Sequence, residues 1–133
     1  MAHSLVAITG CSGCLVAQWG AGWEDLLLWK SAENPARPRS LVMPISFPAQ
    51  ENACLRAMVE RGEVMEVTRE SECLGERERA FMTGHSIQRI LILPLVLHDD
   101  QVGIAALMDG NARRVFSLSD RLIAQVLVRQ ATT

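Results

Sequence analysis

Two cysteines separated by two residues, Cys11 and Cys14, are the first side chains whose spacing suits chemistry. Two thiolates at this spacing can chelate a metal ion, but tetrahedral zinc takes four ligands. The four cysteines of the chain match no spacing typical of an iron–sulfur cluster. The remaining candidate ligands occur singly along the chain: Cys54, Cys73, His3, His85 and His98. We therefore expect no metal site and interpret Cys11 and Cys14 as flanking a tight turn.

The same pair is a weak candidate for redox chemistry. A reactive pair of this spacing has its first sulfur at a helix N-terminus, which lowers the pKa of the thiol. The glycines and the serine around Cys11 predict a turn between strands, and such a turn does not lower the pKa. We therefore assign no redox role to Cys11 and Cys14.

Three candidate pocket residues lie close together in the sequence within residues 85–89. Arg89 carries a guanidinium, which binds anions in a bidentate manner. His85 titrates near neutral pH and can donate or accept a hydrogen bond there. Ser86 lies beside it. Two interpretations stay open, because these side chains either line a pocket or point outward at the edge of a strand.

The composition is typical of one globular domain. The chain has 133 residues, of which 49% are hydrophobic and 21% charged, enough for a core of its own. Its formal net charge of -2 argues against a surface that binds nucleic acid. The sequence shows neither a signal peptide nor a membrane-spanning run, and its cysteines do not form a secreted disulfide framework. We expect a cytoplasmic protein without a nucleic-acid or membrane partner.

The first half of the chain predicts short strands joined by turns. Residues 4–9 (SLVAIT) and 14–19 are rich in strand formers and flank two glycines, so we expect a hairpin. The next segments are an ambiguous strand or helical turn over residues 23–30, a loop over 31–40 and an edge or bulged strand over 41–47, which contains Pro44.

The middle of the chain changes to a helical pattern. Residues 49–61 predict a helix that ends at Gly62, and residues 63–68 (EVMEVT) alternate as a strand does. Residues 70–83 predict a charged surface helix that ends at Gly84.

The last third contains the clearest elements. Residues 89–97 (RILILPLVL) and 101–108 (QVGIAALM) flank a turn and predict a β-hairpin. Ser117 and Asp120 resemble a capping box at the start of a final helix over residues 118–128. We expect the following side chains to form one apolar stripe on this helix: Leu118, Leu122, Ile123, Val126 and Leu127.

Three stretches of the second half carry a family likeness. They are residues 57–67 (AMVERGEVMEV), residues 90–95 (ILILPL) with 101–104 (QVGI), and residues 113–120 (RRVFSLSD). They resemble the GAF domain, a small-molecule sensor module of bacterial signalling proteins. The likeness covers residues 50–130, and it extends to the first 50 residues only through the order of the strands.

The sequence departs from this family at two places. GAF domains commonly begin with a helix, whereas residues 4–9 predict a strand. Serine is common at the position of Arg89, so the chemistry of the pocket is expected to differ there.

The resemblance implies an α+β fold with a central antiparallel sheet of about six strands and helices on both faces, as in GAF and PAS domains. It implies one GAF-like domain over residues 1–133, either complete or a fragment of a larger signalling protein. In this fold the segment before the central strand overhangs the sheet, and the implied ligand-binding residues are Cys73, Phe81, His85, Ser86 and Arg89.

The implied function is that of a non-enzymatic sensor without a cofactor. The domain would bind a small molecule and pass the signal through its C-terminal helix to an output domain. That output domain would be a histidine kinase of a two-component system, a cyclase or a transcription regulator. The apolar stripe of the helix also predicts a homodimer.

Alternatives of other classes remain open. Cys73 lies in the segment where GAF photosensors attach a bilin, although Leu74 stands where they place a histidine and the chain has no tyrosine. Haem would require an apolar pocket at His85, and an iron–sulfur cluster would require all four cysteines. A free methionine sulfoxide reductase would use Cys54 and Cys73 for thiol exchange, but the flanking motifs of that branch are absent.

Overall fold

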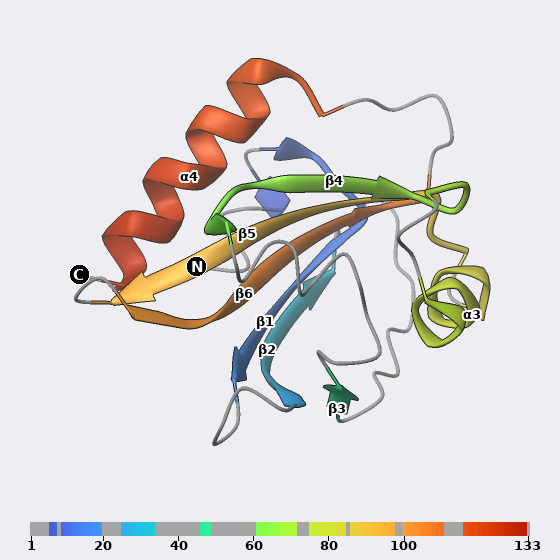
Figure 1. Ribbon diagram of the computed structural model, residues 1–133. Helices are drawn as coiled ribbons and strands as arrows, with labels where there is room; N and C mark the ends of the chain where they lie inside the picture. Colours follow the sequence, from blue (N-terminus) through green and yellow to red (C-terminus); the bar gives the residue numbers. More distant parts are fainter. Residues whose placement is uncertain are drawn as a thin grey trace.

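Six strands form one antiparallel sheet in the computed structural model of this chain (Figure 1). Their order is β3-β2-β1-β6-β5-β4. The strands are β1 (Gly13–Trp19), β2 (Asp25–Glu33), β3 (Ser46–Pro48), β4 (Met65–Thr68), β5 (Arg89–Leu97) and β6 (Asp100–Asp109), and the helices are α3 (Glu76–Gly84) and α4 (Leu118–Thr132). The structure describes residues 6, 7, 9–19, 25–33, 46–48, 61–71, 75–84, 86–97, 100–110 and 116–132. The predicted α+β class with an antiparallel sheet is confirmed.

The central strands bury side chains on both faces of the sheet, because successive residues of a strand point to opposite sides. One face, here called the α3-side core, contains Leu15, Ala17, Val67, Met82, Ile87, Ile90, Ile92, Ile104, Ala106 and Met108. The other face, the α4-side core, contains Val6, Cys11, Cys14, Val16, Leu91, Leu93, Leu95, Ala105, Leu107, Phe116, Ala124 and Val128. Helices α3 and α4 thus contribute buried side chains to opposite faces.

The hairpin predicted over residues 89–108 is confirmed by β5 and β6, which pair along their whole length. The strand predicted over residues 63–68 is confirmed as β4. This short edge strand pairs with only the first part of β5, from Thr68↔Arg89 to Met65↔Ile92. Beyond Ile92, no described strand pairs with this side of β5.

The hairpin predicted over residues 4–19 is wrong. Its second strand exists as β1, but Val6, Ala7 and Thr9 are helical, and the Gly10 amide donates to the Val6 carbonyl. The physical reason is that both edges of β1 are occupied, by β2 and by β6, so no edge remains for a further strand. The loop predicted over residues 31–40 is wrong at its start, because β2 extends to Glu33.

Helix α3 begins at Glu76 rather than at residue 70, and it ends at Gly84 as predicted. The Ile87 amide donates to the Met82 carbonyl and the Ser86 amide to the Thr83 carbonyl, which is the pattern of a Schellman motif. Ser86 takes the left-handed conformation, with φ 55°, that the motif requires. The turn that follows the helix is therefore at Ser86.

Helix α4 begins with the predicted capping box. The Asp120 amide donates to Oγ of Ser117, and the Ser117 amide donates to Oδ2 of Asp120. The apolar stripe expected on this helix does not pack on the sheet, because four of its five members are exposed: Leu118, Leu122, Ile123 and Val126. Ala124 and Val128 face the sheet instead. No described helix is long and apolar enough to cross a membrane.

The segment before β4 contains the predicted helix-ending glycine. Most of the helix predicted over residues 49–61 lies outside the described residues, but Arg61 is helical and Gly62 follows it with φ 64°. Only glycine takes this left-handed conformation without strain. Gly62 therefore fixes the direction in which the chain enters β4.

A pair of glycine substitutions tests these two helix ends. Gly84→Ala should stabilise the domain by about 0.5–1 kcal/mol, because alanine favours a helix and its Cβ would meet nothing within 4 Å. Gly62→Ala should destabilise it, because φ is +64° and the new Cβ would lie 3.3 Å from Nε2 of Gln101. Urea unfolding of both variants measures the difference, and shifts of the same sign would contradict it.

Candidate functional site

The predicted ligand-binding residues do not meet at one point. Cys73 and His85 lie outside the described residues. Phe81 is half-buried and packs against the α3-side core, while Ser86 is exposed at the turn into β5. Arg89 lies on the opposite face from the predicted pocket, because it shares the strand parity of Leu91 and forms an ion pair on the α4 side.

Glu66 of β4 lies between two arginines from different elements. Its Oε1 accepts from Nη1 of Arg89 at 2.5 Å, and its Oε2 pairs with Nη2 of Arg121 on α4. The Glu66 side chain is only 12% exposed, so its charge is shielded from water and depends on these partners. This ion-pair cluster joins β4, β5 and α4.

A second polar network joins β4 to the end of α3. Directly after β4, Arg69 donates through Nε to the Ile87 carbonyl at 2.7 Å and through Nη2 to the Met82 carbonyl at 3.3 Å. Arg79 of α3 donates in return to the carbonyls of Arg69 and Ser71. The end of α3 is therefore tied to the same strand that carries Glu66.

Sequence reasoning did not single out Glu66. A signal was present in the alternating strand over residues 63–68, where Glu66 shares a face with Val64 and stands beside Val67. A carboxylate in such a strand requires a basic partner if that face is covered. The sequence does not specify which arginines would reach it, because Arg89 and Arg121 are 23 and 55 residues away.

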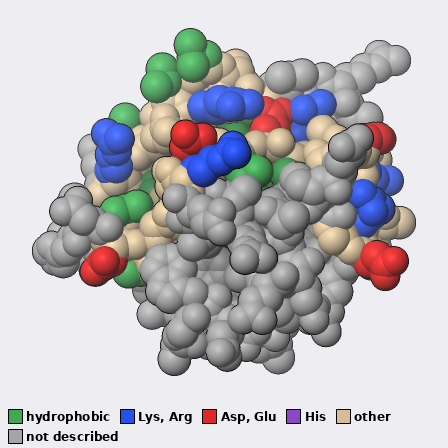
Figure 2. All heavy atoms as spheres, viewed as in Figure 1, with side chains coloured by type: hydrophobic (Ala, Val, Ile, Leu, Met, Phe, Trp, Pro, Cys, Tyr) green, Lys and Arg blue, Asp and Glu red, His purple; other side chains and the backbone are tan. Residues whose placement is uncertain are grey.

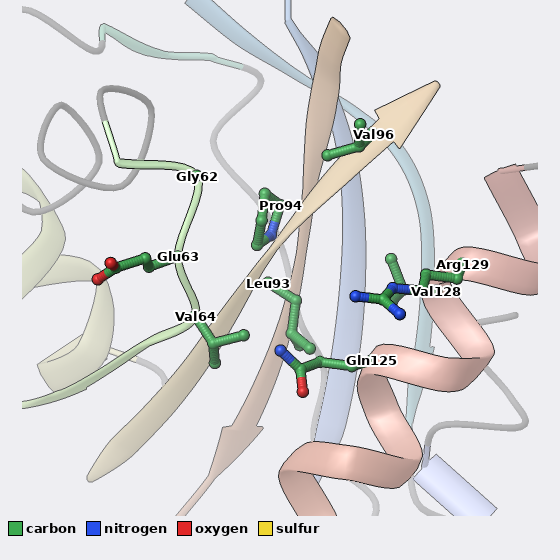
Figure 3. Close-up of a pocket in the computed structure, with 9 residues that line it drawn as sticks. All are labelled: Gly62, Glu63, Val64, Leu93, Pro94, Val96, Gln125, Val128 and Arg129. Carbon is green, nitrogen blue, oxygen red and sulfur yellow. The ribbon is translucent and has the colours of Figure 1, made fainter. Parts of the chain in front are cut away.

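A groove of about 300 Å³ lies between α4, the second half of β5 and the segment that enters β4. It is lined by Gly62, Glu63, Val64, Leu93, Pro94, Val96, Gln125, Val128 and Arg129. Figure 3 shows the side chains of Gln125 and Arg129 directed from α4 toward β5, whereas the carboxylate of Glu63 points away. The groove thus combines an apolar floor with polar nitrogens along one wall.

Cys11 and Cys14 are completely buried in the α4-side core. Burial raises the pKa of the Cys14 thiol well above its ordinary value, and the nearby Cys11 raises it further. The Sγ of Cys11 donates to the Gly13 carbonyl at 3.3 Å. A protonated, buried thiol is neither a good nucleophile nor a good metal ligand. Within the described ranges no three His, Cys, Asp or Glu side chains are grouped to hold a metal ion.

The outward side of α4 carries uncovered apolar side chains. Leu118 is 73% exposed and Leu122 is 53% exposed. Figure 2 shows hydrophobic side chains at the top of the view, where α4 begins, and a group of arginine and acidic side chains beside them. The helix therefore presents Arg121, Ala124 and Val128 to the sheet and an apolar stripe to its surroundings.

Comparison with known families assigns the fold. A model of the GAF domain matches residues 1–133. The chain belongs to the GAF domain family. Domains of this family are typically sensory or regulatory modules without catalytic activity. A search of curated proteins found no match.

Solved structures with the same fold come from several signalling proteins. The GAF domain/HD domain protein from Geobacter sulfurreducens has a TM-score of 0.81 and 17% identity, over 98% of this chain and 84% of that one. The GAF domain of a two-component sensor histidine kinase from Bacillus halodurans has a TM-score of 0.73 and 13% identity, over 98% and 87%. The phycocyanobilin-bound GAF domain of a cyanobacterial phytochrome has a TM-score of 0.77 and 14% identity, over 97% and 76%. These likenesses concern the fold.

The buried thiols of this GAF domain give a direct chemical prediction. Cys11 and Cys14 should resist iodoacetamide in the folded protein at neutral pH, because both side chains are completely buried, and they should react fully in urea. Peptide mass spectrometry measures each cysteine separately, and rapid alkylation of the folded protein would contradict the prediction.

The raised pKa of Cys14 also makes the free energy of unfolding fall as pH rises above about 9, where the unfolded thiol loses its proton and the folded one keeps it. Urea unfolding on either side of this pH measures the fall.

Proposed function

We propose that this GAF domain binds a small molecule on the α3 side of its sheet, under residues 70–89, and reports the binding through α4. It acts as a sensor without catalysis or a resident cofactor. The proposed ligand contacts are Cys73, Phe81, His85 and Ser86. Arg89 has a different role in this proposal, because its ion pair with Glu66 directs it to the α4 side. We call the contacts of Glu66 with Arg89 and Arg121 the relay, since they would carry the signal to α4.

The observation that carries the proposal is the double ion pair of Glu66. A ligand under residues 70–89 would displace the end of α3, which Arg69 ties to the end of β4. Glu66 lies on that same short strand, and its other contacts reach β5 and α4. A displacement of β4 would therefore move the ion pair of Glu66 with Arg121 and change the position of α4 on the sheet.

The sheet itself provides a second, apolar link. Ile90 and Ile92 of β5 pack in the α3-side core, while Leu91 and Leu93 of the same strand pack in the α4-side core. Because interiors are close-packed, a shift of β5 on one face is transmitted to the side chains on the other. A ligand shifts the equilibrium only by the difference in its affinity for the two packings.

The proposed output partner is a signalling domain joined to α4. The similar structures include a GAF domain of a sensor histidine kinase and a GAF domain/HD domain protein. By analogy with these, a histidine kinase or an HD domain would receive the signal from this domain. A cyclase or a transcription regulator is the further candidate that the family resemblance implies. Because the position of α4 depends on the ion pairs of Glu66, a small rotation of this helix could pass to the output domain.

We further propose that the domain forms a homodimer through the outward side of α4. Burying a leucine or valine side chain is worth about 1.5–3 kcal/mol. The exposed set of four apolar side chains on one helix is a surface of the kind that a second copy of the same helix covers: Leu118, Leu122, Ile123 and Val126. A symmetric pair would also bring two output domains together.

The relay predicts a specific effect of removing the charge of Glu66. Glu66→Gln should lower the free energy of unfolding by about 1–3 kcal/mol, because two arginines lose their shared, largely buried counter-charge. Amide hydrogen exchange should accelerate mainly in α4. Glu70→Gln, which removes the charge of an exposed residue just beyond β4, is the control and should change neither quantity. Unchanged exchange in α4 would show that Glu66 is not the link.

Native mass spectrometry of the purified chain tests the ligand and the dimer together. We expect a two-chain complex that retains a small molecule or takes one up from a metabolite extract. Leu122→Arg should yield single chains, because the interface would bury a charge. Thr83→Arg, at an exposed position of α3, should leave the dimer intact. Single chains of wild type that bind nothing from the extract would contradict both proposals.

A further inference from the structure

The groove beneath the second half of α4 lies on the opposite side of the sheet from the proposed sensor face. Leu93 and Val128, which line it, belong to the α4-side core, whereas Phe81 packs against the other core. An occupant of this groove would touch α4 directly. The groove is therefore a separate candidate site, and its failure as a site would leave the function proposed above unaffected.

The floor of the groove suits an apolar chain. Five of its nine lining residues carry an apolar side chain: Val64, Leu93, Pro94, Val96 and Val128. Val96 is 40% exposed, which is unusual for a large apolar residue in the central hairpin. The volume of about 300 Å³ is at the lower limit of ordinary ligand pockets. The fit is to a small molecule with a short apolar chain.

The backbone contributes to the same floor. Described β4 pairs with β5 only as far as Ile92, and the groove begins at the next residue, Leu93. Within the described part of the chain, no strand covers this side of residues 93–96. Gly62, Glu63 and Val64 line the opposite wall without forming a strand. This interruption of the sheet leaves space for a ligand beside β5.

The wall formed by α4 provides donors for one negative charge. Figure 3 shows the guanidinium of Arg129 and the amide of Gln125 reaching from successive turns of α4 toward β5. A guanidinium has five N–H donors, so Arg129 can hold a carboxylate in addition to its other contacts. Glu63 is the acidic residue of the lining, and its carboxylate points away from the groove.

We propose that this groove binds a monocarboxylate with a short alkyl chain, with the carboxylate on Arg129 and Gln125 and the chain on Val64, Leu93 and Val128. One guanidinium matches one negative charge, and the apolar floor matches the chain. The bound molecule bridges α4 and β5, and so it fixes the C-terminal half of the helix on the sheet.

Hexanoate is the probe, and hexanol is its uncharged counterpart. In amide NMR titrations of the full chain, hexanoate should shift the resonances of residues 62–64, 93, 95, 96 and 125–129, and hexanol should bind at least about tenfold more weakly, because it lacks the charge-assisted hydrogen bonds. Arg129→Gln should weaken hexanoate binding by a similar factor and leave hexanol binding unchanged. Val64→Phe should abolish the binding of both by filling the groove.

Arg61→Gln is the matched control, because Arg61 is an exposed arginine beside the groove that does not line it. This variant should bind hexanoate as wild type does. The proposal is overturned if hexanoate shifts no groove resonance, if hexanol binds equally well, or if the two arginine variants weaken binding to the same extent. The last result would mean general attraction of an anion rather than a site.

Discussion

The carboxylate of Glu66, shared by Arg89 and Arg121, is the interaction on which the arrangement of α4 depends. A charge that is mostly removed from water costs several kcal/mol unless opposite charges compensate it. Arg121 can do this only if its side of the helix faces β4. The positions that follow Arg121 at helical spacing, Ala124 and Val128, are then the ones buried against the sheet. The rotation of α4 thus follows from one electrostatic requirement.

The same rotation explains the exposed apolar side of the helix. If α4 turned its most apolar stripe to the sheet, Leu122 and Val126 would be buried, but Arg121 would move away from Glu66. Burial of two such side chains is worth about 3–6 kcal/mol, but it would cost Oε2 of Glu66 its charged partner and leave only Arg89 on Oε1. The second copy proposed above would resolve this conflict, because it would cover the exposed stripe while the ion pairs stay in place.

Elements governed by local chemistry could be predicted from the sequence. The pairing of β5 with β6, the left-handed Gly62 and the capping box of Ser117 and Asp120 depend on residues close together in the sequence. The class and the family followed from these. The helical conformation of Val6, Ala7 and Thr9 could not be predicted, because it depends on both edges of β1 being occupied.

The errors in the candidate site have the same origin. The side chain of Arg89 can point to either face of the sheet, and the position of Glu66 on the neighbouring strand decides between them. The stripe predicted for α4 used hydrophobicity alone and did not include the charge of Arg121. In both cases, ion pairs between residues far apart in the sequence decided which side chains face the sheet.

The two halves of α4 are held by different contacts. The ligand proposed on the α3 side and the carboxylate proposed in the groove would therefore act on different parts of the helix. The first turns are fixed by the ion pair of Arg121, whereas the later turns rest on Val128 beside a groove. A change at Glu66 therefore acts near one end of a rigid helix, and a guest in the groove acts near the other. If both favour the same orientation of α4, each increases the affinity for the other, since coupling between two sites is reciprocal. The helix would then integrate two inputs without any contact between the two ligands.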